Sequence, residues 1–219
     1  MLNRPAPFPD ENRLEATEIE CLRGFQSLFR SLSLAVEAGV GLQVRGANGS
    51  GKTSLLRILC GLALAESGSV FWNGLDIRKS AAEYRAQISY LGHRPALKGE
   101  LTPRENLDVL GALHGRRPDG RRIDEILEAV GIKRRHERPS RTLSAGQQQR
   151  TALARVMLSD APLWILDEPA TALDDPGIGT LRTALRGHLD RGGLVIFTSH
   201  QPLLDTGELR EIRLPGTHD

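Results

Sequence analysis

The feature that most constrains the fold is a glycine-rich octapeptide, Gly46-Ala47-Asn48-Gly49-Ser50-Gly51-Lys52-Thr53. An alternating run over residues 40–45 precedes it, and an apolar stretch over residues 54–60 follows it. These flanks predict a strand, a loop and a helix, the context in which G-x-x-x-x-G-K-[ST] binds phosphate. Glycines let successive backbone N–H groups surround phosphate oxygens, and the helix directs its positive end at them. The flanks disfavour the alternative interpretation, an ordinary glycine-rich turn.

Two side chains of this loop have separate expected roles. Lys52 supplies a mobile positive charge for the outer phosphates, and Thr53 offers a hydroxyl to Mg²⁺. The remaining residues of the octapeptide, with Ser54 after it, are expected to bind the nucleotide through the loop and the start of the helix. The predicted cofactors are ATP and Mg²⁺.

A pair of carboxylates follows the apolar run at residues 163–166. Asp167 is expected to hold Mg²⁺, directly or through water, and Glu168 to act as general base on the attacking water. Strand alternation would point the two side chains to opposite sides, so that only one faces the metal directly. The alternative is a surface turn, because Asp-Glu-Pro is also a turn-like sequence.

A second buried strand is predicted at residues 192–197 and ends in Thr198-Ser199-His200. This strand should lie beside the Asp167 strand, which would let His200 bind the γ-phosphate or the attacking water. The other histidines considered have polar sequence neighbours, and no role is predicted for them. They are His114, His136, His188 and His218.

The remaining sequence predicts an α/β protein with a helical insertion. Further strands are expected at 14–22, 28–36, 70–73 and 209–214, and a further helix at 177–190. Helices are also expected to begin at Thr102, at Asp124 and at Ser144, the first and last with capping boxes. Residues 95–160 are therefore expected to form a helical subdomain within a domain spanning residues 14–219.

Composition narrows the cellular context. The chain has 219 residues, 39% of them hydrophobic, and no uncharged apolar run of about 18 residues that would span a membrane. Residues 1–13 are rich in proline, do not resemble a secretory signal, and are expected to be a disordered tail. Cys21 and Cys60 are expected to be reduced thiols of a cytosolic protein, with Cys60 in the core.

The net charge is +2, with a pI of about 8.7, and basic residues gather between 116 and 141. Acidic residues are interspersed among them, so a solvated surface is the first interpretation. A surface near anionic lipid or a membrane partner is the second. Nucleic-acid binding ranks last, because the cluster contains no aromatic residue to stack on bases.

The segment Leu143-Ser144-Ala145-Gly146-Gln147 resembles the signature motif of the ATP-binding cassette (ABC) ATPases. With the phosphate loop, Asp167-Glu168, Ala172-Leu173-Asp174 and His200, it follows the order and spacing of that family over residues 15–214. The resemblance implies a P-loop NTPase cassette with a parallel core sheet, an antiparallel β subdomain and an inserted helical subdomain. It also implies a head-to-tail homodimer, in which Ser144, Gly146 and Gln147 serve the nucleotide of the other copy and Asp174 links the two sites.

Two positions depart from the general family pattern. His93 stands where the family usually has a glutamine, after the strand that precedes the helical subdomain. We treat it as a candidate catalytic residue. Arg23 stands at the position that usually stacks an aromatic ring on adenine, and its guanidinium can also stack on a purine.

These departures narrow the resemblance to the ATPases of cytochrome c maturation. Two segments that carry it are Leu91-Gly92-His93-Arg94-Pro95 and Thr198-Ser199-His200-Gln201-Pro202. That resemblance implies an ATP-hydrolysing subunit, peripheral on the cytoplasmic face of the inner membrane, that works with integral membrane subunits. ATP hydrolysis would be coupled to heme export or to release of heme from the heme chaperone, with heme handled by the partners. One alternative is the ATPase of an exporter for a drug or lipid. Another is a soluble regulatory ABC protein acting on nucleic acid or ribosomes.

Overall fold

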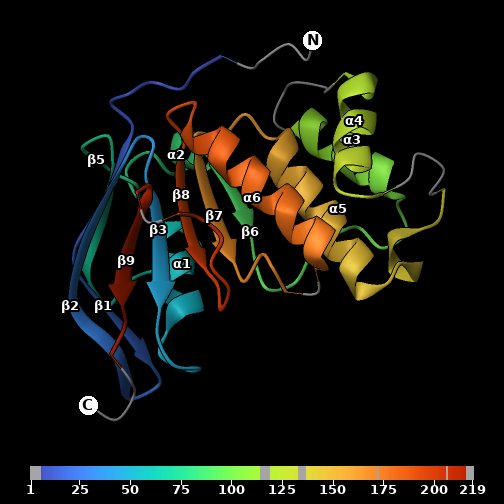
Figure 1. The fold of residues 1–219 in the computed structure, drawn as a ribbon. Coiled ribbons are helices and arrows are strands. Elements are labelled where there is room, and N and C mark those ends of the chain that lie inside the picture. Colours follow the sequence, from blue (N-terminus) through green and yellow to red (C-terminus); the bar gives the residue numbers. More distant parts are fainter. Residues whose placement is uncertain (1–5, 114–118, 133–136, 172, 206, 216–219) are drawn as a thin grey trace.

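The computed structural model describes residues 6–113, 119–132, 137–171, 173–205 and 207–215 (Figure 1). Its centre is a five-stranded sheet in the order β6-β7-β8-β3-β9, with every neighbouring pair parallel. The strands are β6 (Ile88–Leu91), β7 (Leu163–Asp167), β8 (Leu194–Thr198), β3 (Gly41–Arg45) and β9 (Leu209–Arg213). The predicted parallel core sheet is confirmed.

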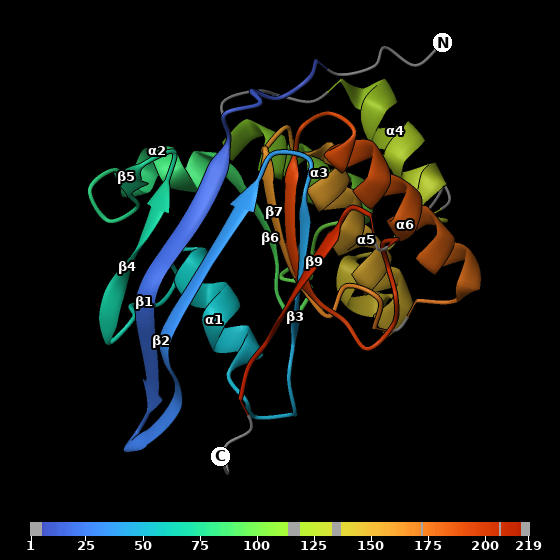
Figure 2. The same ribbon diagram turned by 60° about the vertical axis from the view of Figure 1, so that its left-hand side comes forward.

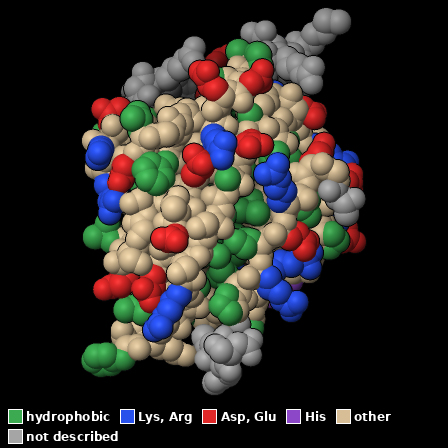
Figure 3. All heavy atoms as spheres, turned by 90° about the vertical axis from the view of Figure 1, so that its left-hand side faces the viewer, with side chains coloured by type: hydrophobic (Ala, Val, Ile, Leu, Met, Phe, Trp, Pro, Cys, Tyr) green, Lys and Arg blue, Asp and Glu red, His purple; other side chains and the backbone are tan. Residues whose placement is uncertain are grey.

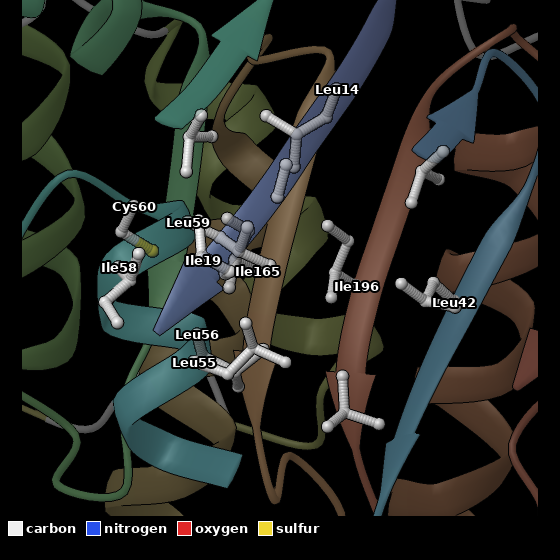
Figure 4. Packing of buried hydrophobic residues seen from close by; sticks show 14 of the residues in the cluster. Leu14, Ile19, Leu42, Leu55, Leu56, Ile58, Leu59, Cys60, Ile165 and Ile196 are labelled. Carbon is white, nitrogen blue, oxygen red and sulfur yellow. The ribbon is translucent and has the colours of Figure 1, made fainter. Parts of the chain in front are cut away.

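Strands β7 and β8 are buried along their whole length, which explains their nearly continuous apolar sequences. Alternate residues point to opposite faces of the sheet. Ile165 and Ile196 pack into a cluster with the helix α1 (Lys52–Leu59) and the second sheet (Figure 4). Trp164 and Phe197 pack on the other face, with α5 (Ala145–Leu158) and α6 (Asp175–Leu189). The core sheet is thus covered on both faces (Figure 2).

Cys60 follows α1 and lies in the first of these clusters, where it is buried (Figure 4). Burial raises the pKa of its thiol, and the nearby Asp167 charge raises it further. The expectation that Cys60 is a core residue is confirmed.

The second sheet is antiparallel and has the order β2-β1-β4-β5. It consists of β2 (Gln26–Glu37), β1 (Arg13–Arg23), β4 (Ser67–Trp72) and the two-residue strand β5 (Leu75–Asp76). The predicted strands are present: β1 and β2 extend beyond their predicted bounds, and β4 begins three residues earlier and ends one residue earlier than predicted. Strand β5 and the short helix α2 (Ala81–Ala86) were not predicted. On the outer side of this sheet, acidic and basic side chains are interspersed (Figure 3).

Between β6 and β7 the chain forms α3 (Pro103–Leu113), α4 (Gly120–Ala129), a 3-10 turn (Ser140–Thr142) and α5. The capping box at Thr102 is confirmed, since Glu105 accepts hydrogen bonds from the Thr102 backbone and hydroxyl. The predicted start of the second helix was wrong. That helix begins at Gly120, because Asp119 rather than Asp124 caps it by accepting from the Arg121 N–H at 3.1 Å.

The basic cluster lies partly outside the described residues, which leave out 116, 117 and 133–135. Described members pair with acidic residues: Arg121 with Glu125, Arg122 with Asp160 and Arg141 with Glu100. These pairs support the interpretation as a solvated surface. In the described part of the chain, no helix is long and apolar enough to cross a membrane.

His188 is the one overlooked histidine within the described residues, since positions 114, 136 and 218 lie outside them. It is 1% exposed and stacks on Trp164, with ring centroids 4.0 Å apart, so the prediction of polar surroundings was wrong. The sequence neighbours of a helical residue do not reveal which face it occupies. Phe8 also contacts this ring, and its N–H donates to the carbonyl of Arg191 at 2.7 Å. This contact ties the start of the described chain to the turn after α6.

Candidate functional site

The phosphate loop joins β3 to α1 at the carboxyl edge of the core sheet. Gly51 caps the helix with a φ of 95°, a conformation that favours glycine. A Cβ at Gly46 would lie 2.5 Å from the Ser50 hydroxyl, so the loop closes on itself too tightly for a side chain there. Lys52 donates from Nζ to the carbonyls of Gly46 and Ala47, at 2.8 and 3.1 Å. The loop therefore places the Lys52 ammonium group beside its own backbone, at the start of α1.

Asp167 is the buried carboxylate that meets this loop. Its Oδ2 accepts a hydrogen bond from the Thr53 hydroxyl at 2.8 Å, and its Oδ1 accepts one from Thr198 at 2.9 Å. Only 3% of Asp167 is exposed, so the alternative of a surface turn is wrong. The end of β7 is thereby fixed both to α1 and to β8.

Glu168 leaves the strand with a φ of 50°, a left-handed conformation that is uncommon for a non-glycine residue. Its backbone N–H donates to the Thr198 hydroxyl at 2.8 Å, which holds the turn. Because regular alternation stops at Asp167, both carboxylates line the same cavity, and the expectation of opposite sides does not hold. His200 lies with Nε2 at 3.6 Å from Glu168 Oε1, at the end of the neighbouring strand, as predicted.

The cavity at this edge has a volume of about 430 Å³. It collects predicted site residues from five separate parts of the chain. Its lining residues are Arg23, Leu28, Asn48, Gly49, Gly51, Lys52, Thr53, Ser54, His93, Asp167, Glu168, Thr171 and His200. Cationic groups, hydroxyls and carboxylates thus converge on one space, as binding a polyphosphate and activating water at its end would require.

The signature segment lies at the start of α5 and is not part of the cavity lining. Ser144 caps this helix: its hydroxyl accepts from the Gln147 N–H at 3.2 Å, and Gln147 Oε1 accepts from the Ser144 N–H at 3.1 Å. The predicted capping box is confirmed. Asp174 caps α6 by accepting from the Gly177 N–H at 3.0 Å and also pairs with Arg150 of α5. These contacts lower the pKa of Asp174, the Gly177 N–H more than Arg150.

Two polar residues near the site were missed by the sequence reasoning. Arg155 of α5 donates to the carbonyls of Pro95 and Ala96, at 3.2 and 2.7 Å, and so holds the loop that carries His93. Gln43 of β3 donates to the carbonyl of Ser199 at 2.8 Å, next to His200. A polar residue inside an apolar strand or helix face was the available signal in both cases.

Comparisons with known proteins agree with this geometry. The family model described as ABC transporter matches residues 29–171. A cytochrome c biogenesis ATP-binding export protein CcmA from Methylococcus capsulatus is 51% identical over 91% of this chain and 96% of its own. The CcmA protein of Nitrosomonas europaea is 45% identical, covering 93% and 94%.

The chain belongs to the CcmA family of ABC transporter ATP-binding proteins. The fold is that of solved ABC structures. A putative ABC transporter ATP-binding protein from Pyrococcus furiosus has a TM-score of 0.79 at 23% identity, covering 92% of this chain and 97% of that one. The structure of an ATP binding subunit of an ABC transporter has a TM-score of 0.78 at 26% identity, covering 85% and 79%. The predicted α/β ABC cassette and the CcmA resemblance are confirmed.

Membership of the ABC transporter family implies that this chain binds ATP. The phosphate loop, the signature segment and Asp167-Glu168 all lie within the matched range, whereas Arg23 and His200 lie outside it. The cavity brings Arg23 and His200 together with the phosphate loop and Asp167-Glu168.

Proposed function

We propose that this chain is the ATP-hydrolysing subunit of an ABC complex for cytochrome c biogenesis. It would couple hydrolysis to heme export or to release of heme from the heme chaperone. The observation that carries the hydrolytic part is the cavity in which the phosphate loop, Asp167, Glu168 and His200 meet. The cytochrome c part rests on the names of its relatives, the first of which is matched over 96% of its length.

The residues beside the loop fit Mg²⁺. Thr53 Oγ1 and Asp167 Oδ2 are hard oxygen donors that lie 2.8 Å apart at the head of α1, the donor chemistry that Mg²⁺ prefers. Thr53 and Asp167 would hold the ion, which supplies neutralising charge to phosphate oxygens when bound.

Each remaining residue has a distinct proposed role in hydrolysis. The backbone of the loop and Lys52 bind the phosphates, and Arg23 stacks on the adenine. Glu168 accepts the proton of the attacking water, while the water oxygen bonds to the γ-phosphorus and the bond to the β–γ bridging oxygen breaks. His200 lies 3.6 Å from Glu168 and would bind the γ-phosphate or the water. His93 lines the same cavity and would orient water or report nucleotide state to the partner.

The complete site would need a second copy. Ser144, Gly146 and Gln147 lie at a capped helix start, suited to a phosphate, but apart from the cavity of their own chain. We place them on the nucleotide of the other protomer in a head-to-tail homodimer, with Asp174 linking the two sites. Residues 14–219 would form one ATP-binding domain, peripheral on the cytoplasmic face of the inner membrane and bound to integral membrane subunits that handle heme.

The test is genetic and biochemical. A strain that lacks this chain should lose covalent heme attachment to c-type cytochromes, and the wild-type chain should restore it while Lys52→Ala should not. Membrane subunits that co-purify with the chain identify the complex. Persisting heme attachment in the deletion strain would contradict the cytochrome c role and favour an exporter of another cargo. ATP hydrolysis by the purified complex tests the enzymatic role separately.

A further inference from the structure

Gln43 is a buried amide in the middle of the core sheet. It belongs to β3, pairs in register with Phe197 of β8 and Glu211 of β9, and is 1% exposed. Its neighbours Leu42 and Val44 are also buried. Central parallel strands are usually apolar, because a buried polar group costs free energy unless it is hydrogen-bonded. The hydrogen-bond partners of this amide therefore indicate its role.

Both ends of the Gln43 side chain are engaged. Its Nε2 donates to the carbonyl of Ser199 at 2.8 Å, and its Oε1 accepts from the Arg45 guanidinium at 3.3 Å. Arg45 in turn pairs with Glu211 at 2.6 Å, at the exposed edge of the sheet. A series of polar contacts thus runs from the surface ion pair of Arg45 and Glu211, through Gln43, to the Ser199 carbonyl.

Ser199 and His200 share one peptide group. Because that group is planar, fixing the Ser199 carbonyl also fixes the N–H of His200 and the direction in which its Cα leaves. Strand β8 ends at Thr198, so both residues lie beyond the regular ladder. The imidazole itself is 72% exposed, and its Nε2 lies 3.6 Å from Glu168 Oε1. The position of His200 therefore depends on its backbone.

We infer that Gln43 is a positioning residue for His200: by holding the Ser199 carbonyl, it sets the approach of the imidazole to Glu168 and to the reacting phosphate. This inference rests on the proposed role of His200 in hydrolysis. Thr198 provides the complementary anchor, since its hydroxyl binds Asp167 on the other side of the same segment. The two anchors hold the segment before His200 from two neighbouring strands.

The test is a double-mutant cycle on steady-state ATP hydrolysis by the complex as isolated from membranes. Gln43→Met keeps the shape of the side chain and removes both hydrogen bonds. We expect kcat to fall about tenfold, the scale of losing the buried hydrogen bond to the Ser199 carbonyl, with KM for ATP changed less than about twofold. His200→Ala should lower kcat further. In the His200→Ala background, Gln43→Met should then have no additional effect, because its influence passes through His200.

Two further variants keep the test decisive. Tyr84→Phe is the matched control, since Tyr84 also donates to a buried backbone carbonyl, that of Leu59 at 2.5 Å, away from the cavity. Its kcat should stay near the wild-type value. If Gln43→Met does not fold, Arg45→Ala leaves the Gln43 bond to Ser199 in place and removes the outer contact of Gln43, together with the Arg45–Glu211 ion pair at the surface. It should lower kcat about two- to threefold, again only when His200 is present.

The outcomes separate the two hypotheses. Wild-type kcat in His200→Ala would overturn the proposed role of His200 itself. A lowered kcat in His200→Ala, together with a wild-type kcat in Gln43→Met, would overturn the positioning role alone. An equal fall caused by Gln43→Met in both backgrounds would indicate a structural effect and also overturn the inference.

Discussion

The hydroxyl of Thr53 donates to Oδ2 of Asp167 at 2.8 Å and so joins the first turn of α1 to the end of β7. The second carboxylate oxygen is engaged by Thr198, so one buried side chain connects three elements of the core. Thr53 Oγ1 and Asp167 Oδ2 are also the proposed ligands of Mg²⁺. The carboxylate thus has a structural role and a proposed chemical one that substitution can separate.

Asp167→Asn should separate them. The amide keeps the shape, and the two hydroxyls can reorient to satisfy it, so we expect the fold to persist with a loss of about 1–2 kcal/mol. Without the negative charge, ATP hydrolysis should fall at least about a hundredfold, and more Mg²⁺ should be needed for half-maximal rate. A magnesium titration of the hydrolysis rate measures both effects. Thr53→Ser keeps the hydroxyl and should behave nearly as wild type; an unchanged magnesium dependence in Asp167→Asn would contradict the assignment.

Glu168→Gln tests the proposed general base. The amide cannot accept the proton of the attacking water, so hydrolysis should slow by about 10²–10⁴, or roughly 3–5 kcal/mol of barrier. ATP affinity should remain, because phosphate binding is assigned to the loop and Lys52. Single-turnover hydrolysis and equilibrium ATP binding measure the two quantities. Glu83→Gln, an exposed change in α2, is the matched control, and near-wild-type hydrolysis by Glu168→Gln would rule out this base.

The sequence was sufficient where a local pattern determines a local structure. The octapeptide, its flanks and the Ser144 capping box specify their own backbone, so these elements occur where they were predicted. The apolar runs of β7 and β8 also identified buried parallel strands, which placed Asp167 and His200 at one edge of a sheet.

Side-chain partners across the fold could not be predicted in the same way. Asp119 and Asp124 are both good helix caps, and only the packing of α4 decides between them. The left-handed turn at Glu168 depends on the Thr198 hydroxyl, a partner contributed by a different strand. Gln43 and Arg155 act on backbone carbonyls distant in sequence, and carbonyls carry no sequence signal.

Asp174 provides a test of the proposed dimer. Its carboxylate caps α6 and pairs with Arg150, which ties the signature helix to the segment expected at the dimer interface. In the Glu168→Gln background, Asp174→Ala should weaken ATP-dependent dimerisation, since it loosens both the cap and the link between helices. Sedimentation with and without ATP measures this. Asp175→Ala, one residue further on and not the cap, is the matched control and should still dimerise. Equal dimerisation of the two variants would count against the linking role of Asp174.

His188 predicts how stability depends on pH. Burial between Phe8 and Trp164 lowers the pKa of the imidazole from 6.5 to about 4. The unfolded chain therefore binds a proton below pH 6.5 that the native chain binds only near pH 4, so the free energy of unfolding falls as the pH falls through this window. Between pH 7.5 and pH 5 the contribution of this group is about 2 kcal/mol. Urea unfolding followed by circular dichroism measures it. His188→Gln should flatten the pH dependence by this amount, whereas Phe8→Leu should lower stability at every pH and keep most of the slope. An equally steep dependence in His188→Gln would show that other groups cause it.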